Sequence, residues 1–257
     1  MPFVNIKQVK VYYEVHGEGD TVVLLHHGFG STKMWKGIYP TLLGKGYKVI
    51  MYDRRGYGQS EKGIDFETFY VSDRFCLESV EELALLREIL NFDSFHIIGQ
   101  CEGGVIGIMY AIKYPTQVKT IAISSTQCFS KIPMVEFNKS AFPKIFQDLE
   151  PEVKEKLISW HGEEHVGPFY NQFRQYGGAY GKGIFDLRPS LPFVKCPTLV
   201  LYPDRSILFD VEQAVEFYRH LPQGELAILP RCGHNTYEEQ PEEYVRFVLN
   251  FLKRHHF

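Results

Sequence analysis

Short apolar runs recur along the chain, and segments of mixed or polar character separate them. The runs that predict strands lie at 21–25, 48–52, 95–98, 118–123, 198–202 and 226–229. Continuous apolar runs of this length are typical of strands that are buried on both faces of a sheet. Two segments before them, 3–7 and 10–15, predict a β-hairpin, because the second is rich in β-branched and aromatic residues. The pattern therefore predicts eight strands.

Helical segments lie between these strands. The segments that predict helices are 33–44, 72–91, 102–114, 210–221 and 241–254. Within 72–91 apolar residues recur every three to five positions, roughly as one face of a helix requires. Strands that alternate with helices form βαβ units, so we expect an α/β fold with a mostly parallel sheet flanked by helices.

One long segment interrupts the alternation. No strand pattern occurs from Gln127 to about Pro189, and the segment is rich in Phe and Tyr. We therefore predict a helical lid at 127–189, inserted into a core formed by 1–126 and 190–257. The lid follows a strand, so it should cover the carboxyl ends of the strands, where open α/β sheets bind ligands.

The aromatic residues of the predicted lid could either pack inside the lid or line a substrate pocket. Most should form the small core of the lid itself, and a few should line a substrate pocket, with Trp160, Phe173 and Tyr176 as our candidates. We expect His161 and His165 on the surface of the lid.

Composition narrows the class of protein. The 257 residues, 44% of them hydrophobic, are enough for one large core, and the net charge of −3 argues against a nucleic-acid-binding surface. No apolar run approaches the ~18 residues of a membrane span, and the first residues do not resemble a signal peptide. The five scattered cysteines suit a reducing compartment. We expect a cytoplasmic monomer or homodimer that acts on a small molecule and binds neither nucleic acid nor membrane.

The sequence Gly99-Gln100-Cys101-Glu102-Gly103 joins a predicted strand to a predicted helix. It has the form of a nucleophile elbow, G-x-S-x-G, with cysteine in place of serine. Glycines are needed on both sides because the turn is sharp and a Cβ would collide with neighbouring backbone. We therefore predict Cys101 as a nucleophile, and we expect the helix N-terminus and a nearby histidine to lower its pKa.

A nucleophile of this kind needs a base and an acid that orients the base. His234 follows the last predicted strand, and Asp204 follows the strand before it. Both should meet Cys101 at the same edge of the sheet. The strand before the lid ends in Ser124-Ser125-Thr126-Gln127 without a carboxylate, so Asp204 is our candidate acid. We interpret Asp210 as a helix N-cap.

Backbone N–H groups must also stabilise the oxyanion that forms during acyl transfer. We expect them from Glu102, directly after the nucleophile, and from Phe29, in the loop after an early strand. Gly28 of the same loop and the Glu102 side chain are further candidates for substrate binding. The carboxylate of Glu102 could bind a cationic group of the substrate, or it could pair with a lid arginine such as Arg174.

Together these motifs resemble the α/β-hydrolase superfamily. The matching segments, in order, are His27-Gly28-Phe29-Gly30, Asp53-Arg54-Arg55-Gly56-Tyr57-Gly58-Gln59-Ser60, Gly99 to Gly104, Asp204 and Gly233-His234. The chain looks most like the small lidded esterases and lactonases, including the biphenyl-hydrolase-like and valacyclovir-hydrolase-like group. The resemblance covers nearly the whole chain outside the lid, and it implies an eight-stranded α/β-hydrolase fold in which the Asp53–Ser60 loop is mostly structural.

The hypothesis is hydrolysis of an ester, thioester or lactone through a Cys101–His234–Asp204 triad and a thioacyl enzyme, without metal or cofactor. The aromatic lid suggests a small, largely apolar or aromatic substrate. Two alternatives stay open: an acyltransferase or thioesterase of a biosynthetic pathway, and a pseudo-hydrolase that only binds a small molecule. A natural cysteine would favour thioesters, lactones or acyl transfer, whereas a cysteine that replaced a serine would indicate a serine hydrolase as parent.

Overall fold

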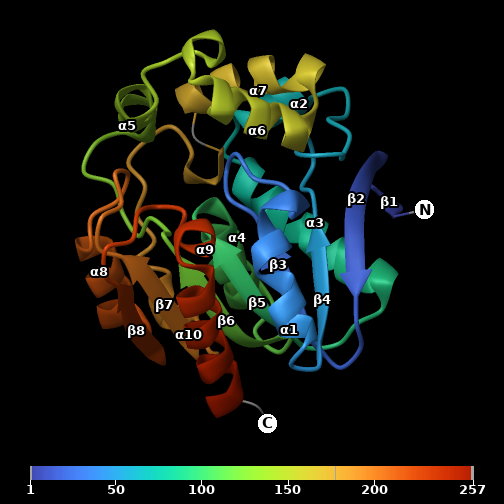
Figure 1. Cartoon of the computed structure of the whole chain (residues 1–257), viewed down its shortest axis with the longest axis vertical. Coiled ribbons are helices and arrows are strands. Elements are labelled where there is room, and N and C mark those ends of the chain that lie inside the picture. The colour runs from blue at the N-terminus through green and yellow to red at the C-terminus, as the bar shows by residue number, and fades with distance from the viewer. Residues whose placement is uncertain (1, 177, 256–257) are drawn as a thin grey trace.

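A single eight-stranded sheet runs through the protein, in the strand order β1-β2-β4-β3-β5-β6-β7-β8 (Figure 1). The computed structural model describes residues 2–176 and 178–255, without the side chain of Tyr176. The strands are β1 (Phe3–Ile6), β2 (Val9–His16), β3 (Asp20–Leu25), β4 (Tyr47–Tyr52), β5 (Phe95–Gln100), β6 (Val118–Ser124), β7 (Thr198–Pro203) and β8 (Gly224–Leu229). All eight predicted strands are present, and their ends differ from the prediction by a few residues.

Strands β3 to β8 pair in parallel, as their continuous apolar runs predict. The first two strands pair with each other antiparallel, which confirms the hairpin, and β2 also joins β4 antiparallel. The carboxyl ends of the parallel strands therefore meet at one edge of the sheet, and the loops that follow β3, β5, β7 and β8 share that edge.

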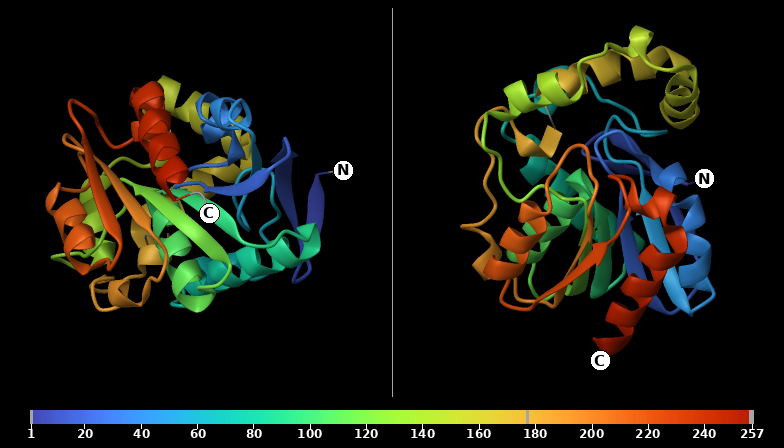
Figure 2. Two further views of the ribbon diagram at one scale, coloured as in Figure 1. Left: turned by 90° about the horizontal axis from the view of Figure 1, so that it is seen from below. Right: turned by 60° about the vertical axis from the view of Figure 1, so that its left-hand side comes forward.

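Helices cover both faces of the sheet (Figure 2, left). Outside the segment between β6 and β7, the helices are α1 (Tyr39–Leu43), α2 (Phe66–Tyr70), α3 (Phe75–Leu90), α4 (Glu102–Lys113), α8 (Glu212–His220), α9 (Thr236–Glu239) and α10 (Pro241–Arg254). Neighbouring strand residues belong to different cores: Val23 and Leu25 pack with α3 and α4, whereas Val22 and Leu24 pack with α1 and α10. This alternation explains why four consecutive positions of β3 are apolar.

The predicted helix 33–44 is two short elements. A 3-10 helix, η1 (Thr32–Gly37), ends before Ile38, and α1 begins directly after it. Pro40 stands in the first turn of α1. Proline has no N–H and fits the start of a helix but not its interior, which explains why one continuous helix does not form.

Between β6 and β7 the chain forms α5 (Met134–Ala141), η2 (Phe146–Asp148), α6 (Pro151–His161), α7 (Glu163–Tyr176), η3 (Gly178–Tyr180) and η4 (Leu191–Phe193). The helices α5, α6 and α7 form a layer across one end of the sheet (Figure 1; Figure 2, right). This layer is the predicted helical segment, and below we call α5 to η3 the lid. Within the described residues, no helix is both long and apolar enough to cross a membrane.

Candidate active site

The turn between β5 and α4 has the geometry of a nucleophile elbow. Cys101 is its central residue and has φ 52° and ψ −115°, a conformation that residues other than glycine rarely adopt. A Cβ on Gly99 would lie 2.6 Å from the Gly103 carbonyl oxygen, and a Cβ on Gly103 would collide with the Leu25 carbonyl. The two glycines therefore permit a strained turn of the kind that persists mainly at functional sites.

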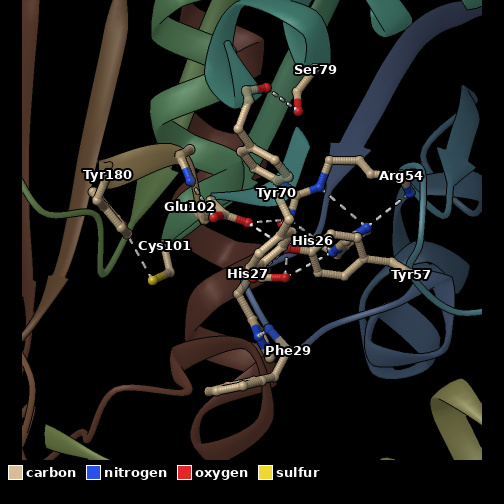
Figure 3. A network of polar contacts seen from close by, with 12 residues as sticks. His26, His27, Phe29, Arg54, Tyr57, Tyr70, Ser79, Cys101, Glu102 and Tyr180 are labelled. Carbon is tan, nitrogen blue, oxygen red and sulfur yellow. Dashed lines mark hydrogen bonds and ion pairs between the residues drawn. The ribbon is translucent and has the colours of Figure 1, made fainter. Parts of the chain in front are cut away.

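The Cys101 thiol is buried under the lid. The side chain is only 8% exposed, and Sγ lies 3.4 Å from the hydroxyl of Tyr180 in η3 (Figure 3). Burial raises the pKa of Cys101 to about 12, and the Tyr180 hydroxyl and the Glu102 backbone N–H oppose this shift only in part. Our expectation of a lowered pKa was wrong, because desolvation outweighs the helix N-terminus.

His234 lies in the loop between β8 and α9. Its backbone carbonyl accepts hydrogen bonds from Gln100 Nε2 at 2.8 Å and from Ser125 Oγ at 2.7 Å, which hold the loop against the ends of β5 and β6. Its Nδ1 lies 3.1 Å from the Ser206 hydroxyl. Burial lowers the pKa of His234 to about 4, so the imidazole is neutral at pH 7.

Asp204 lies at the expected edge of the sheet but has other partners than we expected. One of its carboxylate oxygens accepts the backbone N–H of Cys232 at 3.1 Å, and the other lies 3.9 Å from Arg205 Nε. A hydrogen bond from the Arg231 backbone is the first cause of its lowered pKa. In the described structure the partner of His234 Nδ1 is thus Ser206, and Asp204 supports the loop that carries His234.

The loop after β3 is closed on itself in this structure. The Phe29 N–H, our candidate oxyanion donor, donates to His27 Nδ1 at 3.1 Å, and His27 Nε2 lies 3.1 Å from the Tyr237 hydroxyl. The Glu102 N–H, the other candidate, faces the Cys101 sulfur. The Glu102 N–H could therefore donate directly to an oxyanion, whereas the Phe29 N–H would first have to break its hydrogen bond to His27.

The Glu102 side chain does not line the cavity and pairs with an arginine outside the lid, which corrects both of our expectations for it. It is fully buried and forms an ion pair with Arg54, at 2.7 Å between Arg54 Nη2 and Glu102 Oε2 (Figure 3). The same carboxylate accepts the Tyr57 hydroxyl at 3.1 Å and the Ala179 backbone N–H at 2.7 Å. The ion pair therefore joins the elbow to the Asp53–Ser60 loop and to η3 of the lid, and Arg54 has the structural role expected for that loop.

Arg174, the alternative partner of Glu102, is engaged elsewhere. Its guanidinium donates to the backbone carbonyls of Phe142 and Pro143 at 2.9 and 2.8 Å. His161, expected on the lid surface, is buried instead: its Nδ1 accepts the Gly58 N–H and its Nε2 lies near the Phe29 carbonyl, each at 2.9 Å. The residue therefore holds the lid to two core loops.

A cavity of about 400 Å³ lies between the lid and the elbow. Cys101 and His234 both line it, and apolar lid side chains form most of the opposite wall. Of our substrate-binding candidates, Gly28, Trp160 and Phe173 line the cavity. The side chain of Tyr176 lies outside the described part of the chain. Lys156 also lines the cavity, but its ammonium pairs with Glu238 at 2.6 Å.

Sequence reasoning missed two polar neighbours of the site. Tyr180 was one aromatic residue among many in the lid, and no motif marked it as the residue that contacts Cys101. Ser206 stands two positions after Asp204 in the same loop, and the more conspicuous carboxylate drew the prediction.

Comparison with known proteins now decides the family. A family model described as alpha/beta hydrolase fold matches residues 20–167, more than half of the chain. The chain belongs to the α/β hydrolase fold family. This assignment confirms the fold that the resemblance implied.

Individual relatives of this α/β hydrolase cover nearly its whole length. It is similar to a proline iminopeptidase from Heyndrickxia coagulans, at 26% identity over 93% of each chain. It is also similar to a 2-hydroxy-6-oxo-6-(2'-aminophenyl)hexa-2,4-dienoic acid hydrolase from Metapseudomonas resinovorans, at 26% identity over 98% of this chain and 90% of the other. The structure of an enol-lactonase from Burkholderia xenovorans superposes with a TM-score of 0.79 at 18% identity, covering 98% of this chain and 100% of the other.

Proposed function

We propose that this α/β hydrolase cleaves a small, largely apolar ester, thioester or lactone, with Cys101 as the nucleophile and His234 as its base. The observation that carries the proposal is the placement of both side chains on one cavity, with Cys101 held at a strained turn in the wall of that cavity. A strained backbone costs ~1–3 kcal/mol and persists where surrounding structure enforces it, most often at functional sites.

The protonation states of the site define how the reaction would begin. The pKa of Cys101 is raised to about 12 by burial and that of His234 is lowered to about 4, so both groups are neutral at pH 7. We therefore expect no resting thiolate–imidazolium pair. Instead, the thiol proton passes to His234 as the sulfur attacks the substrate carbonyl, which makes His234 a general base.

The remaining steps follow from acyl transfer chemistry. A new S–C bond forms, the carbonyl oxygen becomes an oxyanion beside the Glu102 N–H, and the C–O or C–S bond to the leaving group breaks as His234 returns the proton to it. Water then attacks the thioacyl enzyme, His234 takes a proton from that water, and the acid is released as the thiol forms again. No step needs a metal or cofactor, and an amine or alcohol in place of water would give acyl transfer.

The cavity wall supports an apolar substrate. Among the described residues of the wall, Lys156 is the one that is charged at pH 7, and the ion pair with Glu238 offsets its charge. The remaining wall is dominated by side chains such as Leu157, Trp160 and Phe173. Relatives whose names include enol-lactonase and dienoic acid hydrolase act on small organic molecules, which agrees with a cavity of about 400 Å³.

A binding protein without turnover is the second candidate. The raised pKa of Cys101 favours it, because a thiol with a pKa of about 12 is a weak nucleophile at pH 7. In that case the cavity would hold the same class of small apolar molecule and release it unchanged.

Intact-mass analysis after mixing with a panel of activated esters, thioesters and lactones separates the two candidates. We expect an acyl mass gain in the wild type and in the matched control Cys76→Ala, whose cysteine is half-buried and lines no part of this cavity. The gain should disappear in Cys101→Ala. If panel members bind but give neither adduct nor product, the hydrolase proposal is wrong and the binding protein is supported.

A further inference from the structure

The Ser206 hydroxyl occupies a position that decides which nitrogen of His234 carries a proton. Ser206 lies in the loop between β7 and α8, and its Oγ is 3.1 Å from His234 Nδ1. The same oxygen accepts the backbone N–H of Leu208 at 3.2 Å and that of Phe209 at 3.1 Å. These two bonds fix the hydroxyl oxygen to the loop.

A hydroxyl group has one hydrogen to donate and two lone pairs that accept. Because both lone pairs of Ser206 Oγ face backbone N–H groups, the remaining contact to His234 uses the hydroxyl hydrogen. Nδ1 is then the acceptor. In a neutral imidazole one nitrogen is a donor and the other an acceptor, so the proton resides on Nε2.

Other groups around His234 do not reverse this assignment. The Asp204 carboxylate is bonded to the Cys232 N–H, and the Phe209 ring packs against the imidazole edge-on at 5.4 Å between centroids. The other titratable residues in the cavity wall are His27, Cys101, Tyr170 and Lys156, and the Lys156 ammonium pairs with Glu238. Burial lowers the pKa of His27 far below its usual range and raises that of Cys101, so both are uncharged at pH 7.

We propose that Ser206, rather than Asp204, is the residue that positions His234, and that it holds the resting imidazole as the Nε2–H tautomer through a hydroxyl-to-Nδ1 hydrogen bond. His234 then presents a hydrogen-bond donor on the nitrogen that Ser206 does not contact. That donor suits a carbonyl or carboxylate oxygen of a bound ligand.

The assignment deepens the proposed function and, in this part, rests on it. A general base must offer a bare nitrogen to the thiol. His234 therefore has to exchange its proton from Nε2 to Nδ1 through water. Ser206 Oγ then has to release one of its two backbone N–H groups before it can accept a hydrogen bond from Nδ1. A carboxylate, which only accepts, would hold the reactive tautomer permanently. Ser206 thus slows the proposed reaction relative to the same site with an acid at this position.

The tautomer can be read directly by ¹⁵N NMR of the full-length protein labelled at histidine. A long-range ¹H–¹⁵N spectrum at pH 7 distinguishes protonated from bare ring nitrogens, and His234→Asn identifies the signal. We expect a protonated Nε2 and a bare Nδ1 in the wild type and in Ser206→Thr, which keeps the hydroxyl. Ser206→Ala should lose this preference, and Asp204→Asn should keep it. A protonated Nδ1 in the wild type, or a tautomer that changes in Asp204→Asn but not in Ser206→Ala, would overturn the proposal.

The variant Ser206→Asp tests the assignment in the opposite direction, because it places an acceptor-only group beside His234 Nδ1. We expect the His234 signal to move to the Nδ1–H tautomer or to the imidazolium, and the alkylation rate of Cys101 by iodoacetamide at pH 7.5 to rise at least tenfold. An unchanged tautomer and rate in a variant whose backbone spectrum is native would contradict the assignment. The NMR readout needs no turnover, so failure of the mass panel would refute the hydrolase while leaving the Ser206 assignment to be decided by the spectra.

Discussion

Removing the charge of Glu102 should destabilise the fold far more than removing a surface charge. In Glu102→Gln the Arg54 guanidinium, whose side chain is 1% exposed, would lose its carboxylate partner at 2.7 Å. Breaking a buried ion pair by changing one partner costs about 3–5 kcal/mol, because an uncompensated charge stays in the low-dielectric interior. Hydrogen bonds from Tyr57 and Ala179 to the former carboxylate would weaken as well.

Urea unfolding, followed by fluorescence and by circular dichroism, measures this loss. Slopes for small proteins are ~1–3 kcal/mol per molar urea and rise with size, so the midpoint should fall by about 1–2 M. The matched control is Glu81→Gln. Glu81 contacts Lys7 and Lys113 at 2.7 and 3.1 Å, but its side chain is 40% exposed, and such pairs contribute less than about 1 kcal/mol.

Two outcomes would refute the reasoning about the buried pair. The first is a loss in Glu102→Gln no larger than that in Glu81→Gln. The second is a loss that disappears in 1 M salt, because salt screens exposed charges but reaches buried pairs much less. The double variant Arg54→Met/Glu102→Gln should cost less than the two single variants together, since it leaves no charge without a partner.

Three further predictions concern the elbow, the lid and the thiol. Gly103→Ala should lower the melting temperature strongly, because the new Cβ would collide with the Leu25 backbone carbonyl. The control Gly37→Ala should leave it nearly unchanged, because a Cβ at that position has no neighbour within 4 Å. Equal melting temperatures for the two variants would contradict the tight turn. Burial lowers the pKa of His161 to about 4, below the ~6.5 of a histidine in the unfolded chain. Between these two pH values the unfolded state binds more protons than the folded state, so the free energy of unfolding falls as the pH drops from ~6.5 to ~4. In His161→Gln this fall should be smaller by up to about 3 kcal/mol, measured by urea unfolding across that pH range, and an identical pH dependence would exclude a buried neutral His161. With a Cys101 pKa of about 12, the rate of alkylation at this site should rise roughly tenfold per pH unit from pH 7 to 10, and a plateau below pH 9 would show that the thiolate forms more easily.

The sheet could be predicted from the sequence because its strands are buried on both faces. Each of the central strands contains a short apolar run, as in β3, and such a run between polar segments is typical of a buried strand. The topology also predicts which edge of the sheet holds the candidate site, since the loops that follow parallel strands meet at one edge. The sequence therefore sufficed to predict that Cys101 and His234 lie at the same edge of the sheet, where both line one cavity.

Side-chain pairing within that edge could not be predicted in the same way. Asp204 and Ser206 share one loop, and the choice between them depends on which backbone N–H groups each side chain meets. Glu102 and Arg54 are 48 positions apart, and neither residue type indicates by itself that it will be buried in a pair. The prediction of a lowered Cys101 pKa was wrong for a related reason. The extent to which the thiol is buried depends on how the lid packs over it.

The bond between Glu102 and Ala179 fixes one end of the lid, and other parts of the lid form the cavity wall. The fixed end is η3, whose Gly178 backbone lies so close to the Glu102 carboxylate that a side chain there would clash. In α6, Val153, Leu157 and Trp160 contribute to the cavity wall, whereas His161 at its end is bonded to the core loops through Gly58 and Phe29. Substitutions of Val153, Leu157 and Trp160 can therefore change the shape of the cavity while the ion pair beneath Cys101 stays intact.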